Sequence, residues 1–79
     1  MANIGLNLKR LRAERNESQA DVAQAAGVWQ SMISGIENGE RTPSLDLLFR
    51  LANYFNVTVD SLNREQLERE QFEIVVSDG

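Results

Sequence analysis

A short segment of small apolar side chains, closed by a glycine, is the feature that most constrains this chain. Ser18 is followed three residues later by Asp21, which is typical of a capping box, where each side chain accepts a hydrogen bond from the other residue's backbone N–H. The pattern predicts a helix that begins at Gln19 and ends at Gly27, because glycine adopts the left-handed conformation easily. Its apolar positions are Val22, Ala23 and Ala26. A helix this short depends on tertiary packing, so we expect a bundle of closely packed helices.

Apolar residues spaced three and four apart predict the other helices of this bundle. The expected helices are 4–15, 19–26, 30–37, 45–55 and a fifth that begins after Thr58 and has Leu62 as its apolar anchor. Ser44 and Thr58 are the expected N-caps of the last two helices, and Asn56 is the expected left-handed exit of the fourth. The expected fold class is therefore all-α.

The chain has 79 residues, which is enough for one core and no second domain. We expect a domain over residues 1–63 and an acidic extension over residues 64–79. Only residues 72–76, within this extension, have the β-branched pattern of a short strand, with an unstructured tail as the alternative. No apolar run approaches the roughly 20 residues that span a bilayer, and no secretory signal opens the chain. A cytoplasmic protein, without a membrane partner, is the expectation.

The chain has no cysteine and no histidine. This composition excludes disulfides, thiolate nucleophiles and Ser-His-Asp triads, and it removes the usual ligands of zinc, iron and copper. We therefore expect no catalytic residues, no metal site and no cofactor. The protein is not expected to be an enzyme.

The net charge of −4 is unevenly distributed along the sequence. Residues 1–59 carry six basic and six acidic side chains, whereas residues 60–79 carry two arginines and six acids. Four of the eight basic residues fall within residues 9–15. A local basic surface is thus compatible with an acidic chain, and binding to nucleic acid is not excluded.

Residues 18–39, with the sequence SQADVAQAAGVWQSMISGIENG, resemble the DNA-binding core of the Cro and phage-repressor family, the Xre-type regulators. The resemblance extends from residue 4 to about residue 63 and leaves only the tail outside. It implies a lambda-repressor-like domain in which the second and third helices form a helix-turn-helix. It also implies that the third helix lies in the major groove of double-stranded DNA.

The resemblance also assigns roles to individual residues. Those that it places toward the bases are Trp29, Gln30, Ser31 and Gly35. A glutamine amide can donate to N7 and accept from the N6 amino group of adenine, a pairing that only A·T offers in the major groove. Those that it places on phosphates are Gln19, Asn38 and Arg41, and Gln19 is also expected to brace Gln30. Arg12 and Glu37 are expected to form a structural ion pair.

Two residues depart from the family pattern. Trp29 stands where a small N-cap is usual and cannot cap the third helix through its ring. Either the indole packs into the core or it lies at the rim that faces DNA, and we favour the rim. Gly35 stands where many members place a longer base-contacting side chain, so contacts from this turn are expected to be weak. Close backbone approach is the alternative role of Gly35.

The expected function is that of a sequence-specific regulator of transcription, a phage-type repressor or a small operon controller of bacterial or phage origin. A homodimer on an inverted repeat is expected, because one helix-turn-helix contacts few base pairs. Its interface is expected in the fourth and fifth helices and in the apolar tail residues Phe72, Ile74 and Val76. The alternatives are the antitoxin of a toxin-antitoxin pair and a protein-interaction module that has lost DNA binding. A toxin or an antirepressor is then a candidate protein partner.

Overall fold

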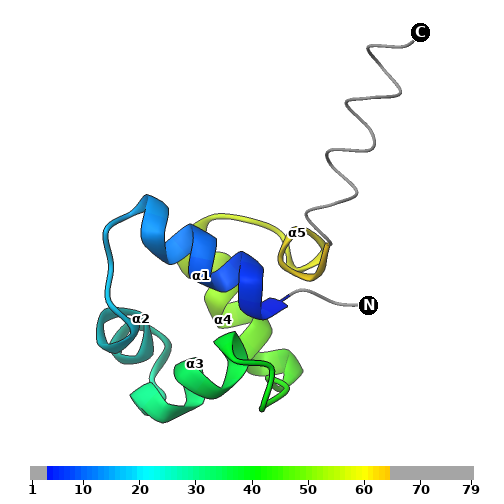
Figure 1. Ribbon diagram of the computed structural model, residues 1–79. Helices are drawn as coiled ribbons and strands as arrows, with labels where there is room; N and C mark the ends of the chain where they lie inside the picture. Colours follow the sequence, from blue (N-terminus) through cyan, green and yellow to red (C-terminus); the bar gives the residue numbers. More distant parts are fainter. Residues whose placement is uncertain (1–3, 65–79) are drawn as a thin grey trace, which may run out of the picture.

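The computed structural model describes residues 4–64 as a bundle of five helices, shown in Figure 1. The helices are α1 (Ile4–Glu14), α2 (Gln19–Ala26), α3 (Gln30–Glu37), α4 (Leu45–Phe55) and α5 (Val59–Asn63). The all-α fold and its five helices confirm the prediction. The strand-like segment 72–76 lies outside the described residues.

The predicted ends of α2 are those of the structure. The Ser18 hydroxyl accepts a hydrogen bond from the Asp21 backbone N–H, and the Asp21 carboxylate accepts one from the Ser18 N–H. The hydrogen bond from the Ser18 backbone, followed by that from its side chain, lowers the pKa of Asp21. Gly27 ends the helix with φ of 73°.

The later helices also begin and end where their caps predict. Ser44 accepts a hydrogen bond from the Leu47 N–H, and Thr58 accepts one from the Ser61 N–H. Asn56 leaves α4 in the left-handed conformation, with φ of 58°. The first helix is one residue shorter than expected and ends at Glu14, because the chain enters a turn there.

A single core lies between the helices and draws on every one of them. Its buried members are Leu8, Val22, Ala23, Ala26, Ile33, Ile36, Leu47, Leu51, Ala52, Phe55 and Leu62. The small side chains of α2 let α3 approach closely, and these two helices lie together at one end of the bundle in Figure 1. None of the helices in the described part of the chain is both long and apolar enough to cross a membrane.

Two residues of α1 join it tightly to its neighbours, and the sequence did not single them out. Asn7 is buried, and its Nδ2 donates to the carbonyl oxygens of Leu62 and Arg64, both at 2.6 Å. A Cβ atom at Gly5 would lie 2.9 Å from the carbonyl oxygen of Glu37, so α1 crosses the end of α3 with backbone against backbone. Asn7 therefore ties α1 to the end of α5, and Gly5 lets α1 lie across the end of α3 that is farther from Trp29.

Candidate nucleic-acid interface

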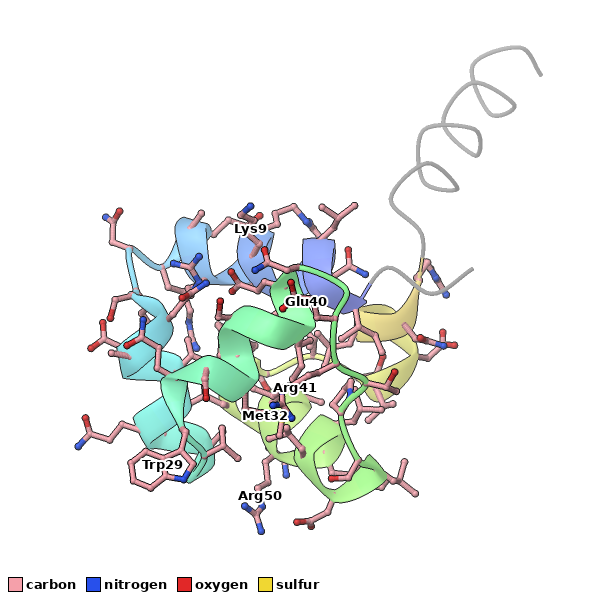
Figure 2. All side chains as sticks on the ribbon, turned by 60° about the horizontal axis from the view of Figure 1, so that its bottom comes forward. Lys9, Trp29, Met32, Glu40, Arg41 and Arg50 are labelled. Atoms are coloured by element: carbon pink, nitrogen blue, oxygen red, sulfur yellow. The ribbon has the colours of Figure 1, made fainter. Side chains whose placement is uncertain are left out.

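The first turn of α3 is open to solvent. Trp29 precedes the helix in an extended conformation, with φ of −74° and ψ of 151°, and makes no side-chain cap hydrogen bond. Its side chain is 85% exposed, so the indole is not part of the core, and Figure 2 shows it projecting from the edge of the molecule. Gln30 and Ser31 follow it and are also exposed. Three of the four residues of the expected base-contacting set are thus open to solvent.

A chain of hydrogen bonds runs from α1 to the exposed end of α3. Arg12 donates from Nε to Oε2 of Glu37 at 2.8 Å and from Nη2 to Oε1 at 3.0 Å. Gln19 donates from Nε2 to Glu37 Oε1, also at 3.0 Å. Gln30 in turn donates from Nε2 to Gln19 Oε1 at 3.4 Å. The Gln19 side chain of α2 therefore connects the exposed Gln30 to the buried carboxylate of Glu37.

The direction of these hydrogen bonds follows from the chemistry of the carboxylate. An ionised Glu37 can only accept, so Gln19 must turn its amide nitrogen toward Glu37 and its oxygen toward Gln30. Gln30 must then turn its own nitrogen toward Gln19. This arrangement leaves Oε1 and the second N–H of Gln30 for another partner. An acceptor beside a donor is the pair that matches the major-groove edge of adenine.

Glu37 is ionised at neutral pH although its side chain is only 1% exposed. Burial alone raises the pKa of this carboxyl group. The hydrogen bonds from Arg12 and Gln19, with the positive charges of Arg12 and Lys9, outweigh burial and hold the pKa below its ordinary value. The hydrogen bond to Glu37 also raises the pKa of Arg12, despite partial desolvation. Because Glu37 stays ionised, it continues to accept from Gln19 and so keeps the amide groups of Gln19 and Gln30 in the orientations described above.

The segment after α3 supplies the remaining expected residues. Asn38 is exposed, and its backbone N–H donates to the Ser34 carbonyl oxygen as α3 ends. Gly39 follows with φ of 78°, which turns the chain away from the helix axis. Arg41 is exposed in the loop that leads to α4. Asn38 thus has a structural role at the helix end, and its amide side chain is on the surface.

Gly35 is buried, so we remove it from the proposed base contacts. The Cδ and Cγ atoms of Arg41 lie where a side chain at position 35 would begin. Close backbone approach, the alternative role of this glycine, is what the structure shows: the Gly35 carbonyl oxygen accepts from the N–H groups of Glu40 and Arg41. Arg41, from the loop after α3, lies over this turn of the helix and is exposed.

A shallow hollow adjoins the exposed end of α3, and sequence reasoning missed it. Its lining residues are Gly27, Val28, Trp29, Ser31, Met32 and Arg41. They come from the turn, the helix and the following loop, so no periodic pattern could have brought them together. Figure 2 shows Met32 and Arg41 close to each other, with Arg50 of α4 below them. The one feature of the sequence that indicated this hollow was Trp29, which stands where the family usually has a small N-cap residue.

The short α2, the glycine turn and the exposed first turn of α3 define a helix-turn-helix domain of the DNA-binding class. Comparison with known proteins agrees: the helix-turn-helix family model HTH_3 matches residues 8–62, and the chain belongs to this family of transcriptional regulators. An uncharacterised HTH-type transcriptional regulator of Methanocaldococcus jannaschii is 40% identical over 55 residues, which are 70% of this chain and 83% of that protein.

Solved structures show the same fold. The master regulator for biofilm formation SinR, in complex with DNA, has a TM-score of 0.70 and 33% identity, over 75% of this chain and 95% of that chain. The restriction-modification controller protein C.AhdI of Aeromonas hydrophila has a TM-score of 0.71 and 30% identity, over 77% of this chain and 92% of that chain. The resemblance to Xre-type regulators is thereby confirmed.

Proposed function

We propose that this regulator binds a specific double-stranded DNA operator by placing α3 in the major groove. The observation that carries the proposal is the Gln30 amide, whose hydrogen bond to Gln19 leaves an acceptor and a donor for an adenine. Ser31 and Trp29 stand beside it on the same exposed turn. They supply a hydroxyl group and an aromatic surface for neighbouring bases or sugars. The similarity to SinR, whose structure is solved in complex with DNA, supports DNA binding by this chain.

Phosphate contacts are proposed on both sides of α3. Gln19 opens α2, where backbone N–H groups without intrahelical partners and the helix dipole favour an anion. Asn38 lies at the other end of α3 with its amide exposed. Such contacts fix the position of the protein on the duplex but carry no sequence information. Specificity then comes from the side chains that reach the bases.

We further propose a homodimer on an inverted repeat, with half-sites about one helical turn, roughly 34 Å, apart. Two large apolar side chains one turn apart on α4 support an interface there: Leu45 is 63% exposed and Phe49 is 53% exposed. The apolar residues Phe72, Ile74 and Val76 of the extension are the second proposed element. This arrangement corresponds to a phage-type repressor or a small operon controller. The structural neighbour C.AhdI is a restriction-modification controller protein.

The acidic extension also has the chemistry to contact another protein. Residues 60–79 account for the whole net charge of −4, so they repel DNA and belong away from the groove. An antitoxin that uses this extension for its toxin is the second candidate function, and an antirepressor is the alternative partner. All these roles place the protein in the cytoplasm at the nucleoid.

Selection of bound duplexes from a random library tests the proposed function. The expected product is an imperfect inverted repeat with an A·T pair at one symmetric position in each half-site. A bound pool with the same base composition as the input would refute specific DNA binding. A single asymmetric half-site bound by a monomer would refute the homodimer but leave DNA binding intact.

A further inference from the structure

We propose that Arg41 contacts a base pair in the major groove, in place of the side chain that Gly35 lacks. The inference rests on the proposed function, because it concerns how α3 selects its operator. It changes the role that the family resemblance gives to Arg41, from a phosphate contact to a residue that determines specificity.

The aliphatic stem of Arg41 lies directly over Gly35. A Cβ atom at Gly35 would lie 2.8 Å from Cδ, 2.9 Å from Cγ and 3.3 Å from Nε of Arg41. The stem thus occupies the space that opens because position 35 has no side chain. The loop backbone is fixed there too, since the Gly35 carbonyl oxygen accepts from the N–H of Glu40 at 2.8 Å and that of Arg41 at 3.1 Å.

Arg41 also lies beside the first turn of α3. Its side chain lines the same hollow as Trp29, Ser31 and Met32 of the first turn of α3. Gly35 stands four residues after Ser31, which is one turn along the same face of a helix. Arg41 therefore extends the base-facing surface of α3 by one turn. This position beside the proposed base-contacting residues favours a base contact over a contact with phosphate alone.

The guanidinium group of Arg41 is also available. Within residues 4–64 it takes part in no ion pair, whereas Arg50 nearby pairs with Asp46 at 2.7 Å and donates to the Ala26 carbonyl oxygen at 3.1 Å. A planar guanidinium donates two parallel hydrogen bonds to O6 and N7 of guanine, the commonest specific contact in the major groove. The chemistry of Arg41 therefore suits a G·C pair in the same half-site.

Duplex selection with four variants tests the inference. Arg41→Ala is expected to lower discrimination at one symmetric G·C position by about 5- to 150-fold, with little change elsewhere in the site. Arg41→Lys keeps the charge but not the planar group, so it should retain affinity for unrelated duplexes and lose most of the discrimination. Gly35→Ala should reproduce this loss, because the new methyl group displaces the stem of Arg41 and alanine suits a helix. Arg50→Ala is the matched control and should leave the preferred bases unchanged.

Each outcome is decisive. Arg41→Ala that weakens all duplexes by the same factor, with Arg41→Lys equal to wild type, shows a phosphate contact and overturns the inference. Gly35→Ala with the wild-type preference and a wild-type melting curve overturns the positioning by Gly35. A wild-type protein that selects no duplex refutes the proposed function, which separates that failure from the failure of this inference.

Discussion

Gln19 of α2 accepts a hydrogen bond from Gln30 and donates one to Glu37, so one amide side chain links the exposed turn of α3 to a buried ion pair. The link restricts rotation of the Gln30 amide before any DNA is bound. A preorganised contact loses less side-chain entropy on binding than one that is free to rotate. The arrangement thus favours one orientation of the Gln30 amide, the orientation that the proposed contact with adenine requires.

The first prediction concerns Gln30. Gln30→Ala should cost about 1–3 kcal/mol on the selected operator and flatten the preference at the symmetric A·T position, because both hydrogen bonds to adenine are lost. Affinity for unrelated duplexes should remain. Fluorescence anisotropy with the operator and with variants at that position measures both quantities. An unchanged ratio between these duplexes would show that α3 does not select sequence through this residue.

Gln19→Ala should reproduce part of this effect without touching a base. Its loss frees the Gln30 amide to rotate, so discrimination at the A·T position should fall by less than in Gln30→Ala. The two changes act on one contact, so the double variant should lose less than the sum of the single losses. Additive losses in a double-mutant cycle would mean that the hydrogen bond between the two glutamines does not matter for specificity.

Glu37→Gln should destabilise the domain in a pH-dependent way. Removing one charge of a buried pair costs roughly 3–5 kcal/mol in the general case, and less here because the Arg12 side chain is 18% exposed. The pKa of Glu37 is below its ordinary value of 4.5, so the stabilisation is present above that pH. It is lost as the pH falls through the lower folded-state pKa.

Urea unfolding of the wild type and of Glu37→Gln at a series of pH values measures this difference. The free energies of unfolding should differ most near neutral pH and converge in acid. Asp46→Asn, which removes an exposed partner of Arg50, is the matched control and should have a small effect at every pH. A difference that stays constant down to strongly acidic pH would contradict the assignment of the pKa shift to this pair.

Trp29 offers an optical test, since it is the only tryptophan in the chain. Its indole is exposed in the free protein, so contact with DNA should change the intensity and the emission maximum of its fluorescence. The change should be half-maximal at the dissociation constant of the selected operator and should saturate well above it. Emission that stays constant while anisotropy reports full binding would place Trp29 outside the interface.

Deletion of residues 72–79 tests the extension. On the proposed arrangement the truncated protein should have a higher dimer dissociation constant and weaker operator binding, with the same preferred bases. Phe49→Ala should have a similar effect through α4, where this side chain is exposed. Analytical ultracentrifugation gives the dissociation constants. An unchanged dimer in the truncated protein would remove the extension from the interface.

The helices and their ends could be predicted from short stretches of sequence. Ser18, Gly27, Ser44, Asn56 and Thr58 act through backbone groups only a few residues away, so their effect is visible in a short stretch of sequence. The spacing of apolar residues likewise fixes which face of each helix is buried. Those local rules were sufficient to predict five helices, whereas the position of the first turn of α3 on the surface was expected only from the family resemblance.

The meeting of side chains that lie far apart in the sequence depends on how the helices pack. Asn7 carries no local sign that its amide will bind the carbonyl oxygens at the end of α5. Arg41 and Gly35 are six positions apart on different elements, and their contact depends on how the loop folds back on α3. The family resemblance therefore assigned a base contact to Gly35, whereas the structure buries Gly35 and places the stem of Arg41 over it. Contacts of this kind depend on the packing of whole elements, which local propensity does not encode.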